Sequence, residues 1–140
     1  VVILVSLGML FLLKFVILSS SPGERAQFTR SELATNTLNA LMLTRTECYG
    51  MNIAALVQDC ASLNSVECPG GRRSCDFLEG EVGFILEKTL LQWKKHFEFT
   101  LKSRGVTLVE LEDEFGCSGS QDKHSQPFSG GILVELSVCD

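Results

Sequence analysis

The sequence has little of what catalytic and nucleic-acid-binding sites are usually built from. Its 140 residues include only two His, one Trp and one Tyr, and they contain no Gly-rich phosphate loop, no HExxH motif and no GxSxG nucleophile elbow. Basic residues are scarce as well. Lys14 is one of the 12 Lys and Arg, so beyond residue 18 only 11 stand against 17 Asp and Glu. Because a nucleic-acid partner requires a basic surface, we expect neither an enzyme nor a nucleic-acid-binding protein.

Side chains that could hold a metal or a cofactor are also missing at useful spacings. The closest cysteines, Cys68 and Cys75, are six residues apart, whereas structural zinc sites favour C-x2-C pairs. The acidic cluster at 110–114 lacks the alternation and the Gly of an EF-hand loop, and a solvated loop is expected there. His96 is expected to be a solvated or capping residue, and His124 to lie in a polar loop. We therefore expect no metal and no cofactor.

An apolar run occupies the start of the chain. Fifteen of the first 18 residues are apolar, and as a helix they would span about 27 Å, close to the thickness of a bilayer core. The run begins at Val1, with neither an initiator Met nor a basic leader in front of it. Since a secretory signal peptide is removed together with its apolar core, this pattern indicates cleavage before the apolar segment.

An apolar N-terminus of this kind resembles that of the type IV pilin superfamily, which includes archaeal pilin-like proteins. The resemblance implies a segment that anchors the subunit in the membrane before assembly and forms the filament core afterwards. The implied partners are copies of the chain itself, the membrane and the pilus assembly machinery, and the implied role is adhesion or surface attachment. Bacterial pilins usually carry an aromatic first residue and a glutamate at the fifth, where this chain has Val1 and Val5. Archaeal members often lack that glutamate, which favours an archaeal-type filament.

The resemblance predicts a membrane and filament-core role for most side chains of the apolar run. These are Val1, Val2, Ile3, Leu4, Val5, Leu7, Gly8, Leu10, Phe11, Leu12, Leu13, Lys14, Phe15 and Ile17. The small residues Ser6 and Gly8 would allow helices to approach closely. Lys14 lies near the end of the run, where it can extend to the membrane interface or pair with a carboxylate such as Glu24 of a neighbouring subunit.

Composition divides the chain into three parts. Residues 1–21 are expected to form a hydrophobic stem helix, residues 22–29 a break or hinge at Pro22 and Gly23, and residues 30–140 an extracellular α+β head. An alternative is a single-pass membrane-anchored extracellular binding or adhesion domain that does not polymerise. In either case the protein is expected at the cell surface.

Helical periodicity in the head predicts two or three helices. A capping box at Thr29-x-x-Glu32 introduces a helix over about 30–47, and shorter stretches predict helices over 51–59 and 77–95. The residues expected to face the core are Ala34, Leu38, Leu41, Met42, Ile53, Leu56 and Val57. The helix over 77–95 is marked by Leu78, Val82, Ile85, Leu86, Thr89 and Trp93.

Alternating apolar residues predict a small antiparallel sheet of three strands. A hairpin is expected over 97–111, with a turn at Ser103-Arg104-Gly105 and a bulge between Leu108 and Val109. Residues 112–130 are expected to be a long loop. In the last strand Ile132, Val134, Leu136 and Val138 share one face.

Six cysteines outside the cytosol indicate three disulfides, which a head of this size needs as covalent support. They are Cys48, Cys60, Cys68, Cys75, Cys117 and Cys139, and they allow fifteen pairings. The tight loop between Cys68 and Cys75 favours that pair, and a Cys117–Cys139 bridge would hold the long loop to the last strand. The remaining pair, Cys48 and Cys60, would lie about 12 Å apart across a straight helix, against about 7 Å for a bridge, so a swap with Cys117 or Cys139 stays open.

Overall fold

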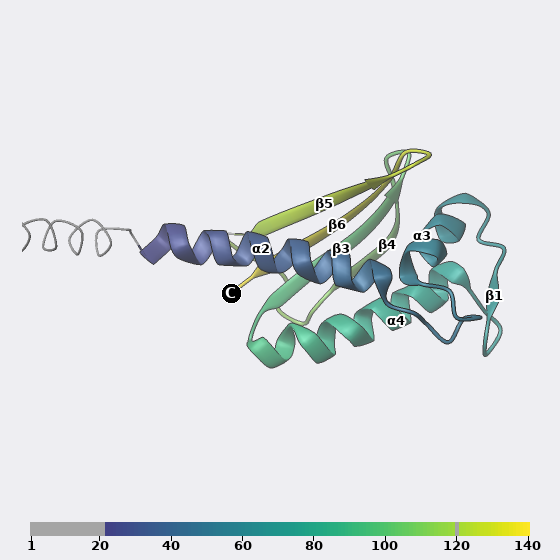
Figure 1. Cartoon of the computed structure of the whole chain (residues 1–140), viewed down its shortest axis with the longest axis horizontal. Coiled ribbons are helices and arrows are strands. Elements are labelled where there is room, and N and C mark those ends of the chain that lie inside the picture. Colours follow the sequence, from purple (N-terminus) through teal and green to yellow (C-terminus); the bar gives the residue numbers. More distant parts are fainter. Residues whose placement is uncertain (1–21, 120) are drawn as a thin grey trace, which may run out of the picture.

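The computed structural model describes the backbone of residues 22–119 and 121–140, and the side chains from residue 31 onward (Figure 1). The apolar run, with every residue expected in the membrane anchor and filament core, lies outside the described residues. Within them the chain is α+β, with three α-helices, one short 3-10 helix and two antiparallel sheets.

The first described helix, α2, spans Pro22–Leu43, which corrects two expectations. Residues 22–29, expected to be a break or hinge, are helical, while the junction of Pro22 with the preceding residues lies outside the described part of the chain. Proline is well tolerated in the first turn, where its missing N–H has no intrahelical partner to lose. Thr29 lies inside the helix and does not cap it. The helix ends at Leu43, before the predicted residue 47, because the chain turns there and a backbone bridge joins Arg45 to Asn52.

The expected long hydrophobic helix is absent from the described residues. The longest helix, α2, buries one stripe formed by Ala34, Leu38, Leu41 and Met42 and leaves polar residues between them exposed. No helix in the described part of the chain has both the length and the apolar composition needed to cross a bilayer.

Two further helices agree with the periodicity of the sequence. Helix α3, Ile53–Ser62, begins at Asn52, whose side chain accepts a hydrogen bond from the Ala55 N–H at 2.9 Å. Helix α4, Ser74–Thr89, is followed by the 3-10 helix η1, Leu91–Trp93. Helix α4 ends at Thr89, before the predicted residue 95, and the Trp93 side chain in η1 is 59% exposed, because the chain tightens there and Lys94 takes the left-handed conformation.

The main sheet has four strands rather than the expected three, in the order β4-β3-β6-β5. Strands β3 (His96–Ser103), β4 (Val106–Glu112) and β6 (Ile132–Cys139) match the predicted ones, and a register shift beside Leu101 leaves Leu108 as the extra, bulged residue. The fourth strand, β5 (Asp122–Phe128), lies in the segment expected to be a loop. It pairs only with β6, and an edge strand can be polar and can carry a proline such as Pro127.

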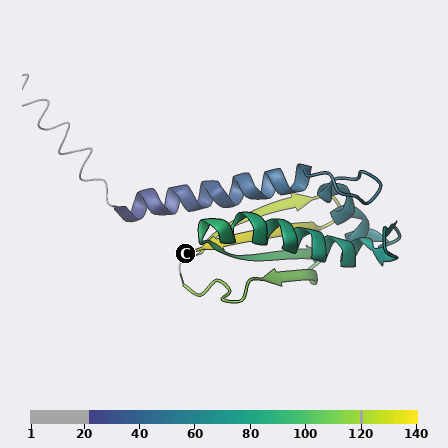
Figure 2. The ribbon, with the colours of Figure 1, turned by 90° about the horizontal axis from the view of Figure 1, so that it is seen from below.

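Helices α2 and α4 cover the same face of this sheet (Figure 2). Helix α2 packs on β5 and β6, and α4 on β4, so the core fills the space between the helix layer and the sheet. The four residues predicted to share the inner face of β6 are all buried, as are Phe97, Phe99 and Leu101 of β3.

The three disulfides expected from the cysteine count are present, but of the expected pairings only Cys117–Cys139 is right, and Cys68–Cys75 and Cys48–Cys60 are wrong. They join Cys48 to Cys68, Cys60 to Cys75 and Cys117 to Cys139. The Cys68–Cys75 pairing fails because residues between them form a two-stranded sheet, β1 (Glu67–Cys68) and β2 (Arg72–Arg73), which pairs Cys68 with Arg72. Cys75 lies instead in the first turn of α4 and reaches Cys60 of α3, while Cys48 pairs with Cys68, so the swap left open with Cys117 or Cys139 does not occur.

Candidate binding site at the distal end

The end of the fold farthest from the start of α2 contains a polar cavity. This distal end comprises α3, the β1–β2 sheet and the two hairpin turns at 103–105 and 129–131, while α2 begins and the chain terminates at the other, proximal end (Figure 1). The cavity has a volume of about 490 Å³ and lies between the end of α3 and both turns. Its polar lining comes from Gln58, Ser62, Ser103, Arg104 and Ser129.

The two turns are locked to each other by their backbones. The Arg104 N–H donates to the Gly131 carbonyl at 2.9 Å. Gly131 has φ +76°, a left-handed conformation that favours glycine. Arg104 and Gly105 form the two-residue turn between β3 and β4, with φ of 50° and 83°. Positive φ at both positions is typical of a type I′ hairpin turn.

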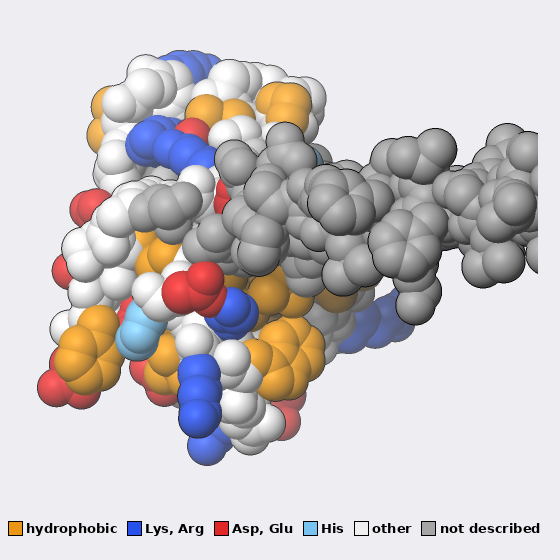
Figure 3. Space-filling model, turned by 90° about the vertical axis from the view of Figure 1, so that its left-hand side faces the viewer, with side chains coloured by type: hydrophobic (Ala, Val, Ile, Leu, Met, Phe, Trp, Pro, Cys, Tyr) orange, Lys and Arg blue, Asp and Glu red, His pale blue; other side chains and the backbone are white. Residues whose placement is uncertain are grey.

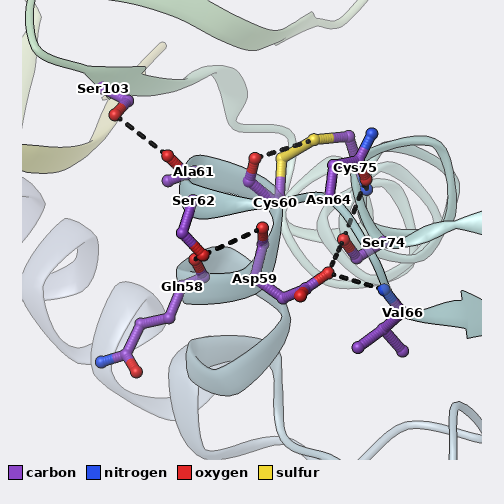
Figure 4. Close-up of a disulfide and its surroundings, with 10 residues drawn as sticks. All are labelled: Gln58, Asp59, Cys60, Ala61, Ser62, Asn64, Val66, Ser74, Cys75 and Ser103. Carbon is purple, nitrogen blue, oxygen red and sulfur yellow. Dashed lines mark hydrogen bonds between the residues drawn. A yellow bond between two sulfur atoms is a disulfide. The ribbon is translucent and has the colours of Figure 1, made fainter.

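The opposite wall is the last turn of α3, where three carbonyl groups accept hydrogen bonds from within the fold. The Ser103 hydroxyl donates to the Ala61 carbonyl at 3.2 Å, and the Ser62 hydroxyl to the Gln58 carbonyl at 2.7 Å (Figure 4). The Asp59 carbonyl accepts from the backbone N–H of Leu63 at 3.1 Å. A free helix C-terminus would repel anions, and these donors reduce that effect.

Behind this wall, a polar network fixes α3 against α4. The Asp59 carboxylate accepts hydrogen bonds from the Val66 N–H at 3.0 Å and from the hydroxyls of Ser65 and Ser74 at 2.9 and 2.5 Å. It points to the side of α3 away from Ser103 (Figure 4). Burial raises the pKa of Asp59, but the hydrogen bonds together outweigh it and hold the pKa below its ordinary value. The Cys60–Cys75 disulfide ties the same two helices, so the cavity wall is rigid.

Arg104 is the only charged residue in the cavity lining. The lining includes no Asp or Glu, and the Arg104 guanidinium makes no ion pair with the described residues. The rest of the lining is apolar or backbone, including Ala61, Leu63 and the nearly buried Ile132. An exposed cation among hydroxyl groups can bind a small anionic ligand.

The histidines and the acidic cluster lie elsewhere. Of the cluster only Asp113 is buried, and Glu110, Glu112 and Glu114 are exposed. At the proximal end, His96 Nδ1 lies 2.6 Å from the Asp113 carboxylate, which is 3% exposed and also accepts from the Phe97 N–H at 3.1 Å. Asp113 is therefore buried, which corrects the expectation of a solvated loop. His124 Nδ1 lies 3.1 Å from the Thr35 hydroxyl of α2, since His124 belongs to β5 and not to a loop.

The proximal end presents a mixed surface. Hydrophobic, acidic and basic side chains lie interspersed there around a histidine (Figure 3). Within the described ranges, no three His, Cys, Asp or Glu side chains gather in a way that could hold a metal ion. A second hollow of about 350 Å³ runs between α2 and α4, but its lining, which includes Leu33, Ile85 and the exposed Trp93, holds no charged residue.

Sequence reasoning identified the turn at Arg104 but not its role in a cavity. The available signal was the residue type. The first position of a two-residue hairpin turn normally carries Asn, Asp or Gly, and arginine there is unfavourable. The lining residues Ser62 and Ser129 lie 42 residues before Arg104 and 25 residues after it in the chain, and only the fold brings them together.

Comparison of the chain with protein-family models, with curated proteins and with solved structures finds no match.

Proposed function

We propose that the chain is a structural subunit of an extracellular filament similar to a type IV pilus. The observation that carries the proposal is the position at which the apolar segment joins the fold. Residues 1–18 precede α2 in the chain, and α2 begins at the proximal end, opposite the disulfide-linked distal end (Figure 1). A head attached in this way can face solvent while the apolar segments of many copies pack together.

Burial of the apolar segment supplies the driving force in this proposal. Fifteen apolar residues would be removed from water or lipid contact among neighbouring copies. At about 25 cal/mol per Å² of apolar surface buried from water, even partial burial stabilises the assembly by many kcal/mol per subunit. The head supports the role because its three disulfides hold a small fold together in an oxidising environment.

The proposed partners are copies of the chain, the membrane before assembly, and an assembly machinery of the pilus type. The proposed role of the filament is adhesion or surface attachment, without catalytic activity. The acidic balance of the chain supports no nucleic-acid partner.

Electron microscopy of material sheared from producing cells, with mass spectrometry of the fibres, tests the proposal. We expect thin filaments that consist of this chain. A chain that stays in the membrane fraction as single copies, with no filaments, would instead identify a membrane-anchored binding domain and refute the proposal.

A pair of matched variants tests the role of the apolar segment. Leu10→Asp places a charge inside it, and we expect filaments to disappear. Leu43→Asp makes the same change at a side chain that is 74% exposed at the end of α2, and filaments should persist. Normal filaments from Leu10→Asp would contradict packing of the apolar segments.

A further inference from the structure

We propose that the distal cavity binds a sugar acid, meaning a sugar ring that carries a carboxylate, as uronic and neuraminic acids do. The inference rests on the cavity and its lining and is independent of filament formation. A volume of about 490 Å³ lies within the range of roughly 300–1,000 Å³ typical of small-molecule sites.

The carboxylate is expected to bind the Arg104 guanidinium. A planar guanidinium donates two parallel hydrogen bonds to a carboxylate, a geometry that gives both strength and orientation. Arg104 is exposed, makes no ion pair with the described residues and is the only charge in the lining. The carboxylate of Asp59 in α3 is directed to the other side of that helix and is held by three donors there.

The hydroxyl groups of the sugar are expected to donate to the serine oxygens. The protons of Ser62 and Ser103 already point to carbonyl groups of α3, so their Oγ atoms face a ligand as acceptors. The Gln58 amide offers both a donor and an acceptor. A bare anion would leave these groups unused, whereas a ring with several hydroxyls would use them.

The apolar part of the lining suits the C–H face of a sugar ring. Ile132 is 7% exposed at the base of the cavity and Leu63 is exposed beside it. Covering such side chains with a C–H surface removes apolar area from water, while the ring hydroxyls stay at the polar side. The cavity thus places one cation, two acceptors and an apolar patch around one space.

The backbone conformation at Arg104 indicates that arginine is retained there for its side chain. A non-glycine residue at φ 50° is strained, and residues held in this way are concentrated at functional sites. Asn or Gly would make the same turn at a lower cost. Arginine at this position is explained if its side chain is needed in the cavity.

Four probes separate the contributions. The full chain, in a zwitterionic detergent that contains no sugar, would be titrated with glucuronate, N-acetylneuraminate, glucose and acetate and followed by amide NMR. We expect saturable shifts at Gly105, Gly130 and Gly131 with at least one of the two sugar acids. Glucose lacks the carboxylate and acetate lacks the ring, so each should bind at least tenfold more weakly. Equal binding of acetate would identify a general anion site and overturn the proposal, as would no saturable shift with either sugar acid.

Two substitutions locate the site. Arg104→Asn keeps a residue suited to the turn, so the fold should be retained while affinity for the sugar acid falls at least tenfold. Arg45→Asn removes the same charge from an exposed residue outside the cavity and should leave affinity unchanged. Ser129→Phe should block the cavity without altering Arg104. Unchanged affinity in both Arg104→Asn and Ser129→Phe would place any binding elsewhere and overturn the proposal.

Discussion

The two ends of the fold are closed by different means. At the distal end, one disulfide joins the turn after α2 to the β1–β2 sheet, and a second joins α3 to α4. The sheet in this region has only two residues in each strand. At the proximal end, a single disulfide joins Cys117 to Cys139, and its second cysteine already belongs to β6, a strand paired on both sides. The distal end is thus held mainly by covalent bonds, and the proximal end mainly by the sheet.

The hydrogen bonds of the carboxylates also differ between the two ends. The half-buried carboxylate of Asp59 accepts hydrogen bonds from three residues that follow α3, and so ties the segment before β1 and the start of α4 to α3. Asp113 binds His96 and the Phe97 N–H at the start of β3, where the ladder to β6 already fixes the backbone. We therefore expect the distal end to unfold as a unit, and the proximal end to unfold only together with the main sheet.

Removal of both distal disulfides is expected to have the largest effect. Replacing Cys48, Cys60, Cys68 and Cys75 by serine should cost about 6 kcal/mol of stability, at about 3 kcal/mol for each bridge of this loop length. Hydrogen exchange should show loss of protection in α3 and retained protection in β3 and β6. Loss of protection throughout the sheet at the same rate would contradict a separable distal end.

Replacing Cys117 and Cys139 by serine is the matched change at the proximal end. The bridge closes a similar length of chain and should contribute about 3 kcal/mol of global stability. Exchange should increase only in the loop before β5, because β6 keeps both of its partners. Melting of α3 in this variant would show that the ends are coupled.

Loss of the Asp59 or the Asp113 carboxylate should have a smaller effect on stability than loss of the disulfides. Asp59→Ala and Asp113→Ala should each destabilise by about 1–3 kcal/mol, because each leaves buried donors without an acceptor. Hydrogen bonds from His96 and from the N–H groups of Phe97 and Phe115 outweigh burial and lower the pKa of Asp113, so its contribution is present at neutral pH and is lost as the pH falls below its ordinary range. Denaturant unfolding at pH 7 measures both variants, and protection in α3 should fall only for Asp59→Ala.

Glu135 on β6 lies on the outer face of the sheet and belongs to neither end. Hydrogen bonds from Lys102 at 2.6 Å and Lys123 at 2.8 Å lower the pKa of Glu135 from its ordinary 4.5 to about 2. Its stabilising contribution is therefore complete above about pH 4.5 and is lost as the pH falls toward 2. Since both lysines are partly exposed, the loss should be only about 1 kcal/mol. Unfolding curves at several pH values should show a shallower acid decline for Glu135→Gln, and an unchanged decline would contradict this account.

The sequence predicted the parts of the fold in which a buried face repeats regularly. The stripe of α2, the inner face of α3 and the face of β6 that holds Val134 and Leu136 were identified correctly, because each leaves an apolar period in the sequence. Strand β5 was missed because one edge faces no partner strand and its outward residues, such as Lys123, are polar. The disulfide pairing and the cavity were beyond reach because both depend on which distant segments meet.

The same strained backbone conformation occurs near both ends, and it offers the smallest but sharpest test. Arg104 in the distal turn has φ 50°, and Lys94 at the end of η1 has φ 56°. Replacement of either by asparagine should stabilise the fold by about 0.5–1 kcal/mol, because asparagine adopts the left-handed conformation at a lower cost. Thermal unfolding measures both gains. If Arg104 is retained for the cavity, Arg104→Asn should gain stability and lose sugar-acid binding. Lys94→Asn should also gain stability but should bind the sugar acid as before. A stability gain in Arg104→Asn with sugar-acid binding intact would mean that the backbone strain at Arg104 has no connection with the cavity. A loss of binding in Lys94→Asn would show that affinity depends on the lost positive charge and not on its position.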